Sequence, residues 1–352
     1  MRWSAKHVVG IALLGLASLG VALIAALPPV APPLWELEAL PGAPTDSDNG
    51  WAVIRDAWAA GTVPGYELDF PVGPEDPEAL WAAFAEDHEA VDRLLDSDAG
   101  AQARELWADV RARPEFADAC PPVTRWQCPE YAMSSLAAYA QAEILRAAHR
   151  GRWEGASQLN LDLLRVWSGY AATTRSPFAH QLALEFLADG LETASAIAWL
   201  AVRDGVRVAG LDELRAFAET IAIETDFSRA IMFKYVEIDH ALRPTLDAGF
   251  GGPQQSLEYF MVRMIRPQLD ALFVEAMEVA SGMVAPDPHR EPPECPLPSG
   301  AAGCLLLFAI DTSLFGLSRA EHIEQAAERA LRGQKRLKAT MALGAATAAT
   351  RR

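Results

Sequence analysis

The residues that could carry out chemistry in this chain are its seven histidines and 47 acidic side chains. Only one Glu-x-x-His pattern occurs, at Glu237 and His240. Residues three positions apart share a helix face, so this pair could supply half of a carboxylate-bridged metal site. A dinuclear site needs a second such pair, and none is present. The sequence therefore predicts no metal or other cofactor, and the residues to test for convergence are Glu237, His240 and His180, with Glu185, Glu192 and Glu224.

Other short motifs also fail on spacing. Two aspartate-rich stretches, beginning at Asp46 and Asp96, invite comparison with calcium-binding loops. Each has glycine at position five rather than six, and Ala57 or Trp107 stands where the closing glutamate should be. The chain has no Gly-x-Ser-x-Gly elbow, Ser-x-x-Lys pair, Walker loop or Gly-x-Gly-x-x-Gly turn. No catalytic residue is assigned, and nothing in the motifs favours an enzyme.

The N-terminus carries a long apolar segment. Residues Val8 to Leu27 contain no charge, follow Arg2 and Lys6, and precede a proline-rich stretch. A helix of this length rises about 30 Å, which is the thickness of the hydrocarbon core of a bilayer. The cations before the segment predict a cytoplasmic N-terminus over residues 1–7 and a transmembrane signal-anchor over 8–27.

A cleaved signal peptide is the alternative interpretation. The apolar run exceeds the usual length of a signal-peptide core, and prolines follow it in place of a clean Ala-x-Ala site. We therefore expect an uncleaved anchor, with the rest of the chain on the extracytoplasmic (periplasmic) side. Cleavage would instead give a secreted protein.

The four cysteines form two close pairs. Cys120 lies near Cys128, and Cys295 lies near Cys304, each pair within a proline-rich connection. Short loops closed by disulfides are typical of oxidising compartments, whereas zinc thiolates usually show Cys-x2-Cys spacing. Three connectivities are possible, and we predict the local pairs Cys120–Cys128 and Cys295–Cys304.

The charge is strongly acidic and unevenly distributed. The net charge is -17, yet residues 1–35 and all residues after Glu328 contain no acid. The middle of the chain holds 21 cations against 47 acids, which repels phosphate backbones and argues against a nucleic-acid partner. Lysine occurs only four times and asparagine twice, a usage typical of a GC-rich bacterial genome.

Apolar periodicity predicts an all-α fold: a multi-helix bundle or an irregular, solenoid-like array of antiparallel helices after the transmembrane helix. Residues 28–48 are predicted as a proline-rich linker, and 49–352 as the helical domain. Pro244 and Pro267 fall inside helical patterns and are expected to kink or break them. The predicted helices span 51–60, 77–97, 101–113, 129–150, 153–173, 177–204, 211–225, 226–247, 254–284 and 318–349.

One segment resembles a known repeat unit. Residues Ala138 to Ala171 combine small side chains on the first helix with Gly151 at the turn and Ala156 at the point of close approach. This pattern is similar to one helical hairpin of the tetratricopeptide kind, a family that presents concave helix surfaces to peptides. The signature covers about one tenth of the chain and is not repeated clearly. An antiparallel pair within an ordinary bundle explains it equally well.

These observations predict location better than activity. We expect an envelope protein that is held in the membrane by its N-terminal helix and that binds a protein or peptide partner, or acts as a scaffold. The alternative is a hydrolytic or metal-dependent enzyme whose site is assembled from scattered acids and histidines.

Overall fold

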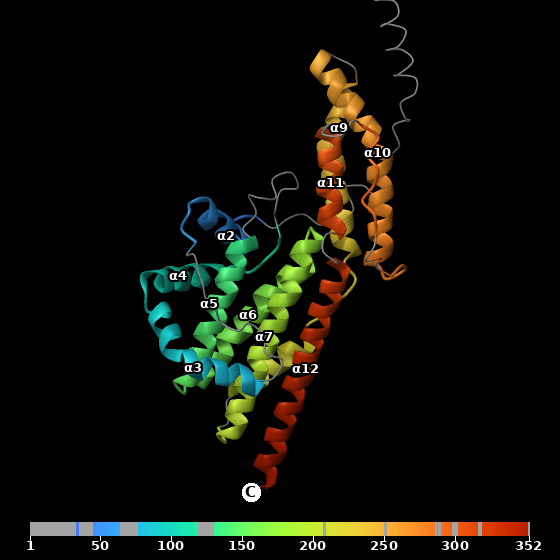
Figure 1. Cartoon of the computed structure of the whole chain (residues 1–352). Helices are drawn as coiled ribbons and strands as arrows, with labels where there is room; N and C mark the ends of the chain where they lie inside the picture. Colours follow the sequence, from blue (N-terminus) through green and yellow to red (C-terminus); the bar gives the residue numbers. More distant parts are fainter. Residues whose placement is uncertain are drawn as a thin grey trace, which may run out of the picture.

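The computed structural model is built from α-helices (Figure 1). It describes residues 33–34, 45–63, 77–118, 130–206, 209–249, 252–285, 287, 290–297, 302–315 and 319–350. These ranges contain no strand, and only one isolated bridge, between Asn49 and Glu115. The predicted all-α fold class is confirmed. The helices are α2 (Gly50–Ala59), α3 (Pro77–Leu95), α4 (Asp98–Arg111), α5 (Glu130–His149), α6 (Trp153–Thr173), α7 (Pro177–Arg203), α8 (Ala209–Thr220), α9 (Ser228–Ala248), α10 (Pro253–Ala280), α11 (Ala302–Phe315) and α12 (Arg319–Thr350).

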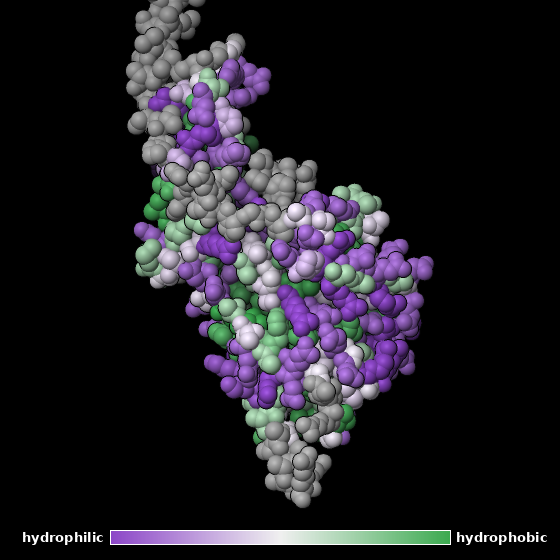
Figure 2. All heavy atoms as spheres, turned by 180° about the vertical axis from the view of Figure 1, so that it is seen from behind, coloured by the Kyte–Doolittle hydropathy of each residue, from purple (hydrophilic) through white to green (hydrophobic). Residues whose placement is uncertain are grey.

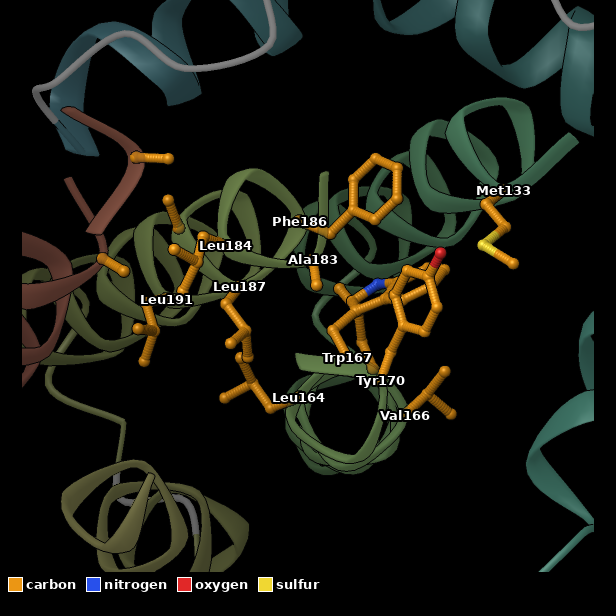
Figure 3. Packing of buried hydrophobic residues seen from close by; sticks show 14 of the residues in the cluster. Met133, Leu164, Val166, Trp167, Tyr170, Ala183, Leu184, Phe186, Leu187 and Leu191 are labelled. Atoms are coloured by element: carbon orange, nitrogen blue, oxygen red, sulfur yellow. The ribbon is translucent and has the colours of Figure 1, made fainter. Parts of the chain in front are cut away.

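Helix α7 is the centre of the main body. It packs against α3, α5, α6 and α12, and most of its residues are buried. Trp167 of α6 fills the space beside it, with its ring 4.6 Å from that of Phe186 and 5.7 Å from that of Phe116 (Figure 3). Leu164, Leu187 and other aliphatic side chains continue this core along α7. Burial of these apolar side chains is the main source of stability.

Local signals in the sequence explain where these helices begin and turn. The side chain of Ser176 accepts a hydrogen bond from the backbone N–H of Ala179, and Pro177 occupies the first turn of α7. Between α5 and α6 the chain reverses at Gly151, whose φ of 71° favours glycine. Helices α5 and α6 lie side by side, as in any antiparallel helical pair, and the resemblance to a tetratricopeptide hairpin stays a prediction.

Helix α12 lies along α7 at a close approach that small residues permit. The side-chain hydroxyl of Ser195 donates to the carbonyl of Gly333 at 3.1 Å. A Cβ atom added to Gly333 would lie 2.9 Å from the Cβ of Leu191, closer than real Cβ contacts. Arg329 adds ion pairs to Asp189 at 2.9 Å and Glu192 at 3.0 Å. At the interface between α7 and α12, the two backbones therefore approach closely at Gly333, and the ion pairs of Arg329 with Asp189 and Glu192 lie beside this contact.

Substitution of Gly333 by Ala is expected to lower the free energy of unfolding by about 1–3 kcal/mol, because α7 and α12 must separate to fit the methyl group. Gly155 of α6 provides the matched control, since an added Cβ there meets nothing within 4 Å. Gly155→Ala should raise the free energy of unfolding by up to about 1 kcal/mol, because alanine has a higher helix propensity than glycine. Denaturant unfolding followed by circular dichroism measures both. Effects of the same sign would contradict the close approach.

Helices α9, α10 and α11 form an arm that projects from the main body at the end opposite the C-terminal end of α12 (Figure 1). Helices α9 and α10 continue through Pro244 and Pro267, so neither proline breaks its helix, and the kink expected as the alternative stays a prediction. Cys295 and Cys304 form the predicted disulfide at the start of α11, with 5.5 Å between their Cα atoms. The other predicted pair, Cys120 and Cys128, lies outside the described residues.

None of the described helices is both long and apolar enough to cross a bilayer. The segment predicted to span the membrane, residues 8–27, lies outside the described residues, as does most of the linker over 28–48. The surface of the main body agrees with its acidic composition, because hydrophilic side chains dominate the face over α2 to α5 (Figure 2).

Candidate functional site

A pocket of about 310 Å³ lies where the end of α6, the start of α7, the end of α8 and the start of α9 meet. Its walls are mainly apolar, with two carboxylates, one arginine and His180 among the polar groups. Ligand-binding pockets commonly have this composition, in which a few polar groups fix the orientation of an apolar ligand. The lining residues are Ser168, Ala171, Ala172, Thr174, His180, Leu184, Phe217, Thr220, Ile221, Ala222, Glu224, Asp226, Phe227, Arg229 and Ala230.

His180 is buried in the pocket wall, and both of its ring nitrogens are engaged. Nε2 lies 3.2 Å from the carbonyl oxygen of Glu224, and Nδ1 lies 3.1 Å from the hydroxyl of Thr174. Because a carbonyl can only accept, Nε2 carries the proton of the neutral ring. The single hydroxyl proton of Thr174 is shared between two acceptors, Nδ1 of His180 and the carbonyl of Ala171 at 3.4 Å. Burial lowers the pKa of His180. The histidine is therefore a neutral structural contact that joins α7 to residues 221–227.

The irregular segment 221–227 forms one wall of the pocket and is held from two sides. His180 binds the carbonyl of Glu224, while Gln334 of α12 donates to the carbonyl of Ala218 at 2.5 Å, just before the segment. The side chain of Asp226 then accepts from the backbone N–H of Ser228 at 2.8 Å, at the start of α9. These contacts hold the wall in place.

The mouth of the pocket is acidic. Glu224 and Asp226 are exposed there. Arg229 is also exposed, but its guanidinium donates to the carbonyl of Ala172 at 2.8 Å and stacks 5.5 Å from the ring of Phe233. Because the guanidinium group of Arg229 is held by these contacts, the carboxylates of Glu224 and Asp226 are the charged groups of the pocket that are most accessible to a ligand. A basic group next to an apolar anchor would match this arrangement.

The predicted pair of Glu237 and His240 is not brought together with further ligands. Glu237 is largely buried and lies 3.9 Å from Arg175, whereas His240 is exposed. No group of three or more metal-binding side chains occurs among the described residues. Burial raises the pKa of Glu237 to about 7, although Lys234 and Arg175 oppose this rise. The carboxyl group belongs to a buried charge cluster between the main body and α9.

Stability is expected to fall as pH rises from about 4.5 to about 7, because unfolded Glu237 releases its proton in this window while the folded state retains it. Glu237→Gln removes this dependence and should raise the free energy of unfolding at pH 8 by about 1–3 kcal/mol, with little change at pH 4. Denaturant unfolding at both pH values measures the difference. Glu213→Gln, at a carboxylate that is 61% exposed, is the control. An unchanged pH profile in Glu237→Gln would contradict the burial argument.

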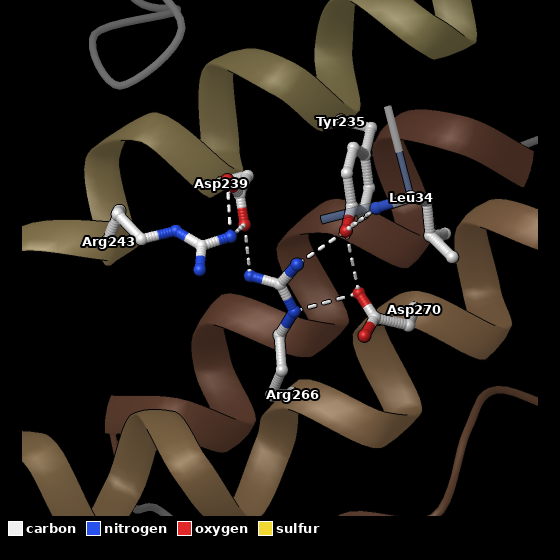
Figure 4. A network of polar contacts seen from close by, with 6 residues as sticks. All are labelled: Leu34, Tyr235, Asp239, Arg243, Arg266 and Asp270. Atoms are coloured by element: carbon white, nitrogen blue, oxygen red, sulfur yellow. Dashed lines mark hydrogen bonds and ion pairs between the residues drawn. The ribbon is translucent and has the colours of Figure 1, made fainter. Parts of the chain in front are cut away.

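A second polar cluster, not anticipated from the sequence, joins α9 to α10 (Figure 4). Arg266 binds Asp239, Asp270 and the hydroxyl group of Tyr235. The same hydroxyl donates to Asp270 at 3.1 Å and accepts from the backbone N–H of Leu34 at 2.9 Å. The cluster therefore holds the chain just after the proline-rich stretch against the arm. The spacing of Arg266 and Asp270 on one helix face was the available signal, but it does not identify the partners on α9.

No protein-family model matches the chain, and neither a curated protein nor a solved structure shows significant similarity to it. Its function is therefore argued from the pocket and from the clusters described above. Among the sequence-predicted candidates, His180 and Glu224 meet at the pocket, and Glu192 is paired with Arg329 far along α7. The pocket is the feature best suited to a ligand.

Proposed function

We propose that this chain is a membrane-anchored envelope protein whose helical domain binds a protein or peptide partner. The partner inserts an apolar side chain into the pocket beside His180 and places a basic group near Glu224 and Asp226. The observation that carries the proposal is the pocket itself, with apolar walls, a fixed neutral histidine and an acidic mouth.

The size of the pocket favours a side chain over a large cofactor. A volume of about 310 Å³ lies at the lower end of the range for small-molecule sites. It suits one or two apolar side chains, as in grooves that bind peptides by anchor residues. Both nitrogens of His180 lie within hydrogen-bonding distance of protein groups, so the histidine acts in this proposal as a fixed part of the wall.

Peptide display against the immobilised full-length protein in detergent tests the pocket. Enriched peptides should carry an aromatic or aliphatic residue next to Lys or Arg, and salt should weaken their binding. Ala172→Trp fills the mouth from an exposed helix position and should abolish enrichment. Ala101→Trp, at an exposed position of α4, should leave enrichment intact. Failure to enrich any peptide, or equal binding by both variants, would reject the proposal.

The anchor is supported by the uncharged segment from Val8 to Leu27 and by the two cations before it. Alkaline extraction of membranes should leave the full chain in the membrane fraction. An alkaline phosphatase fusion after Ala60 should be active, as expected for an extracytoplasmic domain. An inactive fusion would overturn the proposed topology, and release of the chain as a soluble protein would overturn the uncleaved anchor.

A further inference from the structure

Helix α11 exposes a broad face that carries no charge. Leu305 is 63% exposed and Phe308 is 60% exposed, with Leu306 beside them at 37%. Ala309 and Thr312 continue the same face, which covers nearly half of the helix circumference. The face stands in a protein with a net charge of -17, and contiguous exposed apolar surface marks an interaction site.

The apolar face cannot turn inward, because the opposite face of α11 is fixed. Leu307, Ile310 and Leu314 are buried. Asp311 is the only charged residue in the helix, and it points inward to accept from Arg290 at 2.5 Å. Arg290 also stacks 3.8 Å from the ring of Phe315. These contacts orient the helix with its uncharged side outward.

The disulfide fixes the other end of the helix. Cys304 lies one residue before Leu305 and is bonded to Cys295 in the preceding connection. The first turn of α11 is therefore tied covalently to residues that run beside α10. The disulfide at the start of α11 and the contacts of Arg290 near its end together hold the apolar face in one orientation on the arm.

The chain length limits how far this arm can be from the membrane. Leu34 is hydrogen-bonded to Tyr235 of α9 at 2.9 Å. Leu34 follows Leu27, the end of the proposed anchor, by seven positions, and this length of chain can span at most about 25 Å. The C-terminal end of α12 lies at the opposite end of the molecule (Figure 1), and α12 alone is about 48 Å long. The tether thus brings the arm, and not the end of α12, close to the bilayer.

We propose that the exposed face of α11, formed by Leu305, Leu306, Phe308 and Ala309, lies in the interfacial region of the lipid bilayer. This inference rests on the anchor in the proposed function. Leucine and phenylalanine are the residues that amphipathic helices bury at the boundary between headgroups and acyl chains. The face offers no charge to attract a protein of either sign, whereas the tether keeps a bilayer within reach. The arm would thereby fix the orientation of the main body above the membrane.

Site-specific photocrosslinking of the full chain tests this placement. p-Benzoylphenylalanine is introduced at Leu305 or Phe308, and the protein is reconstituted into vesicles of phosphatidylcholine and phosphatidylglycerol. Lipid adducts are expected at both positions. Leu343 is the matched control, because it is 66% exposed but lies on the last turns of α12, where only background labelling is expected.

Alkaline extraction of the same vesicles separates the two proposals. If the chain resists extraction but forms no lipid adducts at Leu305 and Phe308, the anchor is present and α11 does not contact lipid. This result would overturn the inference. Adducts between two protein chains at these positions would also overturn it, in favour of self-association through α11. If alkaline extraction releases the chain, the N-terminal segment is not a membrane anchor. The inference about α11 rests on that anchor and is then also wrong.

Discussion

Replacement of Arg266 by Met is expected to lower the free energy of unfolding by about 3–5 kcal/mol. The side chain of Arg266 is 5% exposed and compensates Asp239 and Asp270, which are 12% and 17% exposed. Without the guanidinium group, Asp270 loses its counter-charge, Asp239 keeps only its pair with Arg243 at 2.9 Å, and the hydroxyl group of Tyr235 loses a donor. Denaturant unfolding of the full chain in detergent, followed by circular dichroism, measures the loss.

Arg165→Met is the matched control for this substitution. The side chain of Arg165 is 48% exposed and pairs with Glu213 at 3.3 Å and Asp162 at 3.5 Å on the surface. Exposed pairs contribute little, so its removal should change the free energy of unfolding by less than about 1 kcal/mol. Equal effects of the two substitutions would show that the cluster between α9 and α10 does not depend on charge.

Trp167→Ala is expected to destabilise the main body by about 3–5 kcal/mol, because it removes the largest side chain from the core and leaves a cavity. Trp167 is 0% exposed and lies among Phe116, Tyr170 and Phe186. Its indole N–H has no hydrogen-bond partner among the described residues, so the loss is one of packing. Thermal and denaturant unfolding of the full chain measure it.

Trp58→Ala provides the comparison for Trp167, since Trp58 is 40% exposed on α2. Trp58→Ala should lower the free energy of unfolding by less than about 1 kcal/mol. Trp167→Phe should fall between the two alanine variants, because phenylalanine fills part of the space and removes the buried N–H. A Trp167→Ala protein as stable as Trp58→Ala would contradict the position of Trp167 at the centre of the core.

Helix positions were largely predictable because local signals agree with the tertiary structure. Pro77 and Pro177 at the first positions of α3 and α7 and the Ser176 cap of α7 are signals of this kind, and the periodicity of α6 and α7 identifies their buried faces. Helix α11 was not predicted as a helix. Its residues are apolar all round, so the sequence lacks the periodic contrast that marks an amphipathic helix. Helix α8 was predicted to continue to Thr225 but ends at Thr220, where tertiary contacts to His180 and Gln334 hold the chain.

The pocket was not predictable, because its walls come from four elements that meet only in the folded chain. His180 was a candidate on chemical grounds, yet its structural role depends on Thr174 and on the backbone of Glu224. Every residue has a backbone carbonyl, so the sequence does not show which one His180 binds. The location of the chain, by contrast, is predicted from the charge and hydropathy of its N-terminal residues, and it stays a prediction because residues 8–27 lie outside the described residues.

The hydrogen bond between Leu34 and Tyr235 also imposes an order on the assembly of the molecule. Its two residues are 201 positions apart, so Leu34 leaves the ribosome long before its partner exists. At typical synthesis rates of about 5–20 residues per second, this interval is on the order of 10–40 s. During that time the segment beside the proposed anchor has no docking site on α9. Docking of Leu34 on α9 is therefore a late step in the formation of the structure, and a chain truncated before α9 cannot reach it.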